Sequence, residues 1–200
     1  MKNYLCINGK KTALTKEQMK QLGILSPVAE LSEDGKIAKI GEYEFIVMKK
    51  DDTMGTVELL LKGTISKNMT FGNNNDYRTS AVRRVVEKFG EEIAELVGEE
   101  NMLEHTVDLT TVSGLKDFGS IKAKMSLLTF DKARANIGLL DQYKLDYCWW
   151  LATATSTKKH GIEYSVTCVA PGGYFYGNRS FCNDFGVRPF CVLKSCIFES

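Results

Sequence analysis

The segment Trp149-Trp150-Leu151 opens the last quarter of the chain, and Gly186-Val187-Arg188-Pro189-Phe190 closes it. Between these segments, apolar and polar residues alternate along 164–168, and the aromatic residues 174–176 follow a glycine turn at 171–173. A period of two is typical of strands, whose successive side chains point to opposite faces. The last quarter therefore predicts a twisted antiparallel sheet whose turns can display variable side chains.

Pro189 stands inside the last predicted strand, Val187 to Leu193. Because proline has no N–H to donate to a neighbouring strand, its position predicts an edge strand or a bulge. We expect Trp149 and Trp150 to lie in the same C-terminal sheet as Val187 to Leu193. We also expect the helix that spans Val82 to Val97 to cover one face of that sheet.

The middle of the chain carries helical patterns. Apolar residues recur at three- and four-residue steps from Val82 to Val97, with glutamates on the other side, which predicts an amphipathic helix. Ser80 is a candidate N-cap for this helix, and Gly90 predicts an interruption in it. Thr129 predicts the cap of a second, short helix.

Two further segments predict strands, 43–47 as a half-buried one and 57–61 as a buried one. The polar residues 71–76 predict a loop. Helices in the middle of the chain and strands around them define an α+β class.

Residues 1–25 predict a small strand-turn-helix unit. Tyr4 to Ile7 is a candidate strand, Asn8-Gly9 is a strong turn signal, and Thr15 is a candidate cap for a helix that ends near Leu22. The main domain would then span 37–200.

The bulk composition narrows the function. The 200 residues include 26 basic and 25 acidic ones, a net charge of +1, which argues against a dedicated nucleic-acid binder. No signal peptide is apparent, and no apolar run approaches the roughly 20 residues that span a bilayer. We therefore expect synthesis in a host cytoplasm, no membrane, and six reduced cysteines.

Several segments occur in an order that resembles a known family: Tyr43 to Val47, Phe71-Gly72 with Ser80, Ser126-Leu127-Leu128-Thr129, Trp149-Trp150-Leu151 and Gly186 to Phe190. The order is similar to an uncharacterised domain family common in Firmicute bacteria and their phages. Its members carry a WWLR-like segment, variable strands rich in serine, asparagine, tyrosine and glycine, and a GVRP-x-x-x-L ending. The resemblance covers roughly residues 37 to 195. This chain departs from it at Ala152-Thr153, where many relatives carry an arginine.

That family more distantly resembles the C-type-lectin-like fold and the formylglycine-generating enzymes built on it. The resemblance implies a scaffold, and a fold alone does not determine a function. It implies a non-catalytic phage or prophage binding protein, on the virion as a fibre, decoration or receptor-binding component. An intracellular accessory protein that inhibits a host defence protein is one alternative, and a copper-dependent oxidase of the formylglycine-generating type is another.

The best candidates for contact with a protein or carbohydrate ligand have side chains that suit adaptable binding surfaces. These residues are Tyr164, Tyr174, Tyr176, Asn178, Arg179 and Asn183. A merely soluble loop region is the alternative interpretation of the same composition.

Three residues have a structural interpretation. One of Trp149 and Trp150 is expected in the core, since neighbours on a strand face opposite sides, and the other under a helix or at the surface. Arg188 is expected to tie the last strand to the domain through a partly buried ion pair.

No catalytic residue, metal site or cofactor is predicted. The spacing of Cys168, Cys182, Cys191 and Cys196 matches neither a zinc site nor the cysteine pair of formylglycine-generating enzymes. His105 and His160 stand in no recognised nucleophile motif, and Asn183-Asp184 lacks the other ligands of a calcium site.

We expect the partner to dock on the surface formed by residues 158–184, because a rigid sheet can carry variable recognition loops. The strand edge of residues 1–25 is the competing site. That edge could attach the protein to a larger assembly or to a second copy in a homo-oligomer.

Overall fold

The computed structural model describes residues 4–7, 10–13 and 28–198. Strands β1 (Tyr4–Ile7) and β2 (Lys10–Ala13) form an antiparallel pair, which confirms the strand predicted at Tyr4 to Ile7. The predicted turn at Asn8-Gly9 and the predicted helix from Thr15 to Leu22 lie outside the described residues. The division of the chain at residues 25 and 37 stays a prediction.

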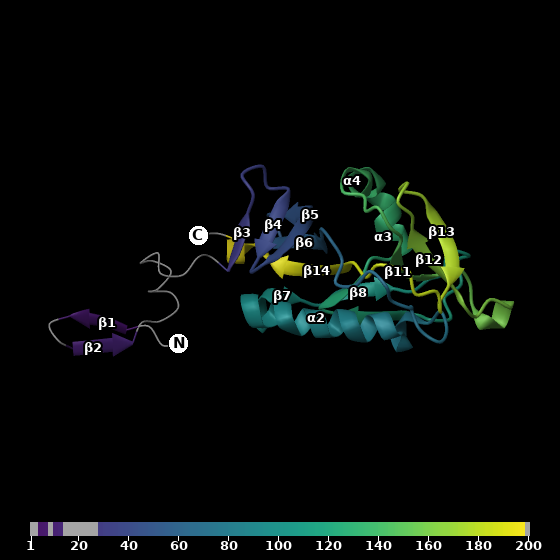
Figure 1. Cartoon of the computed structure of the whole chain (residues 1–200), viewed down its shortest axis with the longest axis horizontal. Helices are drawn as coiled ribbons and strands as arrows, with labels where there is room; N and C mark the ends of the chain where they lie inside the picture. Colours follow the sequence, from purple (N-terminus) through teal and green to yellow (C-terminus); the bar gives the residue numbers. More distant parts are fainter. Residues whose placement is uncertain (1–3, 8–9, 14–27, 199–200) are drawn as a thin grey trace.

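A seven-stranded antiparallel sheet, here called the large sheet, occupies the centre of the molecule (Figure 1). It confirms the strands predicted at 43–47 and 57–61. Its path runs β10, β14, β6, β5, β4, β3, and β7 also pairs with β14. The strands are β3 (Ala29–Leu31), β4 (Ile37–Ile40), β5 (Tyr43–Asp51), β6 (Thr56–Leu61), β7 (Met102–Leu103), β10 (Met125–Leu127) and β14 (Pro189–Lys194).

The position of Pro189 corrects the prediction of an edge strand. Strand β14 lies inside the large sheet, between β6 on one side and β10 and β7 on the other. Pro189 is the first residue of β14 and lies opposite Leu127 of β10. A proline can begin an internal strand, because its position there removes at most one bond at the end of the ladder.

Helix α2 (Ala81–Val97) packs against the large sheet through β10 and β4. It confirms the predicted helix and its cap, since the Ser80 side chain accepts a hydrogen bond from the Arg83 N–H. The interruption predicted at Gly90 is wrong. Gly90 is buried, and a Cβ built on it would lie 3.1 Å from the Met125 Cβ, so the glycine serves close packing on β10.

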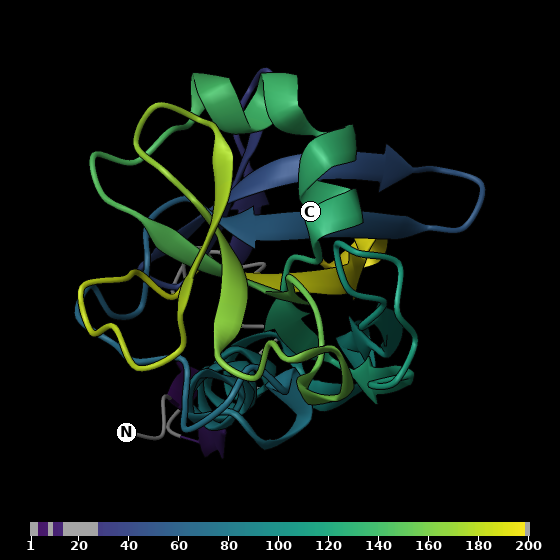
Figure 2. The same cartoon turned by 90° about the vertical axis from the view of Figure 1, so that its right-hand side faces the viewer.

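A separate three-stranded antiparallel sheet, here called the small sheet, consists of β11 (Trp149–Ala154), β12 (Ser165–Val169) and β13 (Phe175–Arg179) in that order. Figure 2 shows β13 in front, nearest the viewer. The prediction that the tryptophans and Val187 to Leu193 share one sheet is therefore wrong. A parallel bridge between Trp149 and Gly186 brings the chain beside β11, and β14 then begins in the large sheet.

Short elements complete the fold, which is a mixed α+β structure with mostly antiparallel sheets. Helices α3 (Phe130–Ala135) and α4 (Ile137–Gln142) follow β10, and Thr129 caps α3 by accepting from the Lys132 N–H, as predicted. The other elements are β8 (His105–Asp108), β9 (Ser120–Ala123), and the 3-10 turns η1 (Tyr77–Thr79), η2 (Glu99–Asn101), η3 (Lys158–His160) and η4 (Ser195–Phe198). Within the described residues, no helix combines the length and apolar character needed to cross a membrane.

Two hydrophobic cores lie on opposite faces of the sheets. The main core joins α2, one face of the large sheet and the inner face of the small sheet, where Trp150 is buried. The second core joins α3 and α4 to the other faces, where Trp149 is buried. Both tryptophans are therefore core residues, whereas the sequence predicted one in the core and the other under a helix or at the surface.

Arg188 connects the two sheets and corrects the predicted ion pair. Its side chain is fully buried and lies over the Trp149 ring, 5.2 Å from the ring centroid. The guanidinium donates to the carbonyl oxygens of Leu61 and Lys62 at 2.7 and 3.0 Å, and to that of Tyr143 at 3.1 Å. It pairs with no carboxylate among the described residues. A planar fork of donors can serve several carbonyls at once, which explains the choice of arginine.

Candidate functional site

Exposed apolar side chains gather around the small sheet. Of the nine large hydrophobic side chains that are exposed in the described part of the chain, six lie within or beside this sheet. They are Val112, Ile137, Ile162, Tyr164, Tyr174 and Phe181. Single exposed apolar residues are ordinary, but a gathering of this kind is typical of a surface that contacts a partner. We call these six residues the exposed apolar surface.

Two residues of this surface, Tyr164 and Phe181, form a cluster with the basic residue Arg179. The rings of Tyr164 and Phe181 meet edge to face with centroids 6.0 Å apart, and the Arg179 guanidinium lies 5.7 Å from the Phe181 centroid. Tyr164 and Arg179 were predicted as binding residues, whereas Phe181 was not. The sequence did offer a signal for Phe181, because this large aromatic residue follows Arg179 and Ser180 in a polar stretch of the predicted docking segment.

Tyr174 and Tyr176 form a second pair, with ring centroids 5.9 Å apart. Tyr174 is the more available of the two, since 63% of its surface is exposed. Tyr176 is half-buried, its ring packs toward Phe185, and its hydroxyl donates to the Cys148 Sγ at 3.0 Å. Burial, followed by this hydrogen bond, raises the pKa of Tyr176 above its usual value. Tyr176 is therefore partly a core residue.

The two predicted asparagines differ in role. Asn178 caps the end of β13, because its Oδ1 accepts from the Arg179 N–H at 2.7 Å and from the Cys182 Sγ at 3.4 Å. Asn183 is exposed, and its side chain makes no hydrogen bond to another described residue. Of the pair, Asn183 is the one free to contact a partner.

A groove of about 400 Å³, here called the small-sheet groove, runs over the small sheet. Its wall is mainly apolar, with Val112 on one rim and Ile137 on another. Thr167 also lines it and is buried, and its hydroxyl has no hydrogen-bond partner among the described residues. The Thr167 hydroxyl oxygen is itself covered from solvent, so it lies beneath the wall of the groove and is not presented to a ligand.

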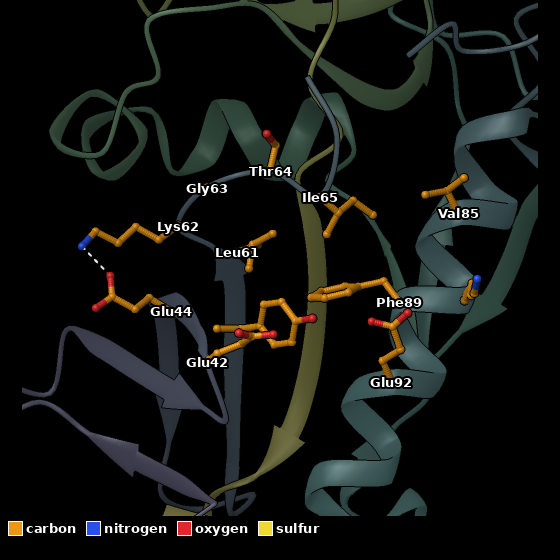
Figure 3. Close-up of a pocket in the computed structure, with 12 residues that line it drawn as sticks. Glu42, Glu44, Leu61, Lys62, Gly63, Thr64, Ile65, Val85, Phe89 and Glu92 are labelled. Carbon is orange, nitrogen blue, oxygen red and sulfur yellow. Dashed lines mark hydrogen bonds and ion pairs between the residues drawn. The ribbon is translucent and has the colours of Figure 1, made fainter. Parts of the chain in front are cut away.

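A larger groove, of about 820 Å³, lies between one end of β5 and β6 and helix α2 (Figure 3). Tyr43 and Phe89 meet edge to face within it, at a centroid distance of 4.9 Å, and Glu92 stands on the α2 side. Burial and then the charge of Glu92 raise the pKa of Tyr43. Glu44 pairs with Lys62 at 2.8 Å at the rim. None of the exposed large apolar side chains of the described residues lines this groove, whereas Val112, Ile137 and Tyr174 line the small-sheet groove, so the small-sheet groove is the better candidate for a ligand.

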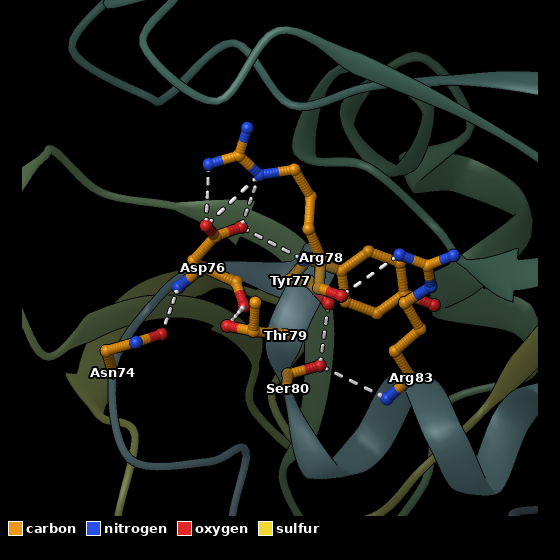
Figure 4. A network of polar contacts seen from close by, with 7 residues as sticks. All are labelled: Asn74, Asp76, Tyr77, Arg78, Thr79, Ser80 and Arg83. Carbon is orange, nitrogen blue, oxygen red and sulfur yellow. Dashed lines mark hydrogen bonds and ion pairs between the residues drawn. The ribbon is translucent and has the colours of Figure 1, made fainter.

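The loop before α2 holds the small sheet in place. The Asn75 Nδ2 donates to the carbonyl oxygens of Ser156 and Ser165, at 2.9 and 3.2 Å. The neighbouring Asp76 accepts two bonds from the Arg78 Nε, at 2.9 and 3.1 Å, beside the Ser80 cap (Figure 4). This network fixes the loop rigidly at the base of the small sheet, which is the support that a binding surface needs.

His105 lies beside a serine in space, which the sequence did not reveal. The His105 Nε2 and the Ser126 Oγ are 2.8 Å apart, and the Ser126 hydroxyl donates to the Leu127 carbonyl at 2.9 Å. Burial, and then the charge of Lys132, lower the pKa of His105 to about 4. Because Ser126 is buried and its proton already has an acceptor, the pair has the arrangement of a buried hydrogen bond and not of an activated nucleophile.

The cysteines in the described part of the chain are free thiols: Cys148, Cys168, Cys182, Cys191 and Cys196. Burial raises the pKa of Cys168 and of Cys191 to about 12. Among residues 4–7, 10–13 and 28–198, no three histidine, cysteine or acidic side chains gather closely enough to hold a metal ion.

The fold and the site define an α+β domain that displays an exposed apolar surface on a small sheet. Residues 112–195 match a family described as a domain of unknown function, DUF6273. The matched segment contains the whole small sheet, the residues of the small-sheet groove and all of β14. This match agrees with the resemblance to an uncharacterised family. No curated protein matches the chain. No solved structure matches it either.

Proposed function

We propose that this protein is a non-catalytic binding protein whose partner docks on the exposed apolar surface. The single observation that carries the proposal is the gathering of six of the nine exposed large hydrophobic side chains around the small sheet. Tyr164, Tyr174 and Phe181 supply aromatic contact area, which is the usual content of an energetically important interface. Asn183 and Arg179 supply a polar surround.

The rigidity of the support favours the same proposal. Asn75 ties the loop before α2 to the small sheet, and Arg188 ties the small sheet's Trp149 to the large sheet. A surface held in one conformation loses little conformational entropy on binding. The C-type-lectin-like scaffold that the sequence resembles would use its surface in the same way, for a protein or carbohydrate ligand.

The resemblance to a phage-borne family carries the biological setting of the proposal. We favour a virion-associated component, and an intracellular inhibitor of a host defence protein would use the same surface. Mass spectrometry of purified particles separates the two settings, because a virion component is present at structural stoichiometry. The oxidase alternative requires copper, and one equivalent of copper in purified protein, lost on mutation of two cysteines, would favour it.

The proposal is tested with a partner captured by the tagged protein. Tyr174→Ala and Arg179→Ala should each weaken binding by about 1 kcal/mol or more, which is the usual threshold for an important contact. Their melting temperatures should stay within a degree or two of the wild type, because both side chains are exposed. Tyr176→Ala is unsuitable, since Tyr176 packs toward Phe185.

Two matched variants decide which surface is used. Met54→Ala, at an exposed turn between β5 and β6, should bind the partner as the wild type does. Deletion of residues 1–25 should also leave binding intact. Binding that is lost on this deletion and unchanged in Tyr174→Ala and Arg179→Ala would show that the N-terminal unit, and not the small sheet, holds the partner.

A further inference from the structure

We propose that the partner contributes an extended peptide segment that pairs with the open edge of β13 as an added antiparallel strand. The segment places an aromatic side chain in the small-sheet groove and an acidic side chain beside Arg179. This inference rests on the proposed function and names the chemistry of the partner at that surface.

The backbone of β13 leaves hydrogen-bonding groups unused on its outer edge. The Ala170 N–H donates to the Tyr174 carbonyl and the Ser180 N–H donates to the Tyr164 carbonyl, which fixes the hydrogen-bonded register between β12 and β13. In this register the even-numbered residues of β13 bond to β12, and the odd-numbered residues point their N–H and C=O groups away from it. Phe175 and Gly177 therefore present a free donor and a free acceptor each.

The outward-pointing N–H and C=O groups of Arg179, by contrast, are bonded within the chain. The Arg179 N–H donates to the Asn178 Oδ1, and the Arg179 carbonyl accepts from the Cys182 N–H at 2.9 Å. The corresponding groups of Phe175 and Gly177 have no partner among the described residues. An unpaired strand edge of this kind is a template for another strand.

The opposite edge of the small sheet is already closed. The Val112 N–H donates to the Ala154 carbonyl at 3.0 Å and the Ser113 N–H donates to the Thr155 carbonyl at 3.1 Å. Residues 112 and 113 thus cover β11, and β13 is the edge that remains available. The covered edge also places Val112 on the rim of the small-sheet groove.

The groove next to this edge selects the side chain. Phe175 and Gly177 lie on the face of β13 that borders the groove, and Thr167 lies directly opposite Gly177 on β12. The Thr155 and Ser165 side chains fill the space over Gly177, so a residue of the added strand opposite Gly177 packs beside them along the groove. The wall of the groove is mainly apolar and includes Phe130, Tyr174 and Phe175, so it fits an aromatic side chain.

The positive charge of Arg179 predicts the second feature of the peptide segment, an acidic residue. The Arg179 guanidinium is exposed and pairs with no carboxylate in the described part of the chain, so it is available to an acidic side chain. Arg179 lies two residues after Gly177 on the same face of β13. In an antiparallel pair the residue opposite Arg179 precedes the residue opposite Gly177 by two positions. The expected segment is therefore an acidic residue, any residue and an aromatic residue, in that order.

Selection from a displayed library of random ten-residue peptides tests this directly. The wild-type protein should enrich peptides with an acidic residue two positions before an aromatic residue. One such peptide is then titrated into variants. Ile137→Glu at the groove rim and Arg179→Glu should each weaken binding at least ten-fold. Thr167→Val should leave binding unchanged, because the Thr167 hydroxyl is covered and does not face the groove. Met54→Glu should bind as the wild type does.

N-methylation of the peptide backbone separates an added strand from any other mode of docking. The aromatic residue faces Gly177, whose N–H and C=O are free to pair with its backbone, so N-methylation at the aromatic residue should abolish binding. N-methylation at the intervening residue should leave binding unchanged, because its N–H points away from β13. Equal loss at both positions, or enriched peptides without the spacing, would overturn the inference.

The outcomes also separate this inference from the proposed function. Peptides that bind without the backbone pattern, yet lose affinity in Ile137→Glu, would overturn strand addition and leave the exposed apolar surface as the docking site. Binding that is unchanged in both Ile137→Glu and Arg179→Glu would overturn strand addition and would also contradict the proposal that the partner docks on the exposed apolar surface.

Discussion

Trp149 and Trp150 are consecutive residues of β11, and their indole rings are buried in two different hydrophobic cores. Trp150 stacks on Phe185 with ring centroids 3.9 Å apart, and its Nε1 donates to the Met69 carbonyl at 2.9 Å. Trp149 packs with the second core and under the Arg188 guanidinium. Strand β11 thereby contributes one tryptophan to the main core and the other to the second core.

Replacement of either tryptophan should therefore destabilise the whole domain. We expect Trp149→Ala and Trp150→Ala each to lower the free energy of unfolding by about 3–5 kcal/mol, the usual cost of removing a large buried side chain. Chemical denaturation followed by circular dichroism measures the loss. An unfolding midpoint unchanged in either variant would contradict the placement of that ring in a core.

Arg188→Lys should be destabilising although it keeps the charge. Burial lowers the pKa of Arg188 to about 10, so the group stays charged at neutral pH and needs its acceptors. A lysine cannot reach the carbonyls of Leu61, Lys62 and Tyr143 together, and we expect a loss of about 2 kcal/mol in unfolding free energy. Arg179→Lys is the matched surface control and should change stability little. Equal stability of the two variants would contradict the account of Arg188.

His105 should make the stability fall in mild acid. Its pKa is about 4 in the folded protein, against about 6.5 in an unfolded chain, so the unfolded state takes up a proton first as the pH drops. The neutral His105 therefore contributes its full share to the free energy of unfolding above pH 6.5. That share is lost as the pH falls from 6.5 toward 4, and the loss is at most about 3 kcal/mol. His105→Gln should remove this part of the pH dependence, whereas the exposed His160→Gln should keep it. If the free energy of unfolding fell with pH in the same way in the wild type and in His105→Gln, His105 would not be the group responsible.

The thiols should all be reduced in freshly purified protein. Titration in denaturant without reductant should detect six reactive cysteines. In the native protein the exposed Cys196 should react first, and Cys168 and Cys191 should react slowly, because burial holds their pKa near 12. Detection of four or fewer thiols in denaturant would indicate a disulfide.

Local signals in the sequence predicted local structure well. The Ser80 cap and the apolar steps of three and four residues predicted α2, because both features act within one or two turns of the helix. The Thr129 cap predicted α3 for the same reason. Gly90 was misinterpreted, since the need for close packing on Met125 is not visible in the sequence.

Long-range pairing was beyond the same signals. A period of two identifies a strand but not its neighbour, so β11 and β14 were assigned to one sheet when they lie in two. Pro189 follows the rule on missing donors, but that rule does not separate the first residue of an internal strand from an edge strand. The buried Thr167 hydroxyl and the open edge of β13 depend on the assembled sheet. Composition alone pointed to Tyr164, Tyr174 and Arg179, and their binding role stays a prediction.

Hydrogen exchange of the protein with and without its captured partner tests the central claim most directly. We predict that binding slows exchange along 162–181, and at the neighbouring segments around Val112 and Ile137, while the turn at Met54 exchanges as before. Slowed exchange confined to residues 1–25, or to the groove between β5 and α2, with 162–181 unchanged, would contradict the claim that the small sheet is the binding surface.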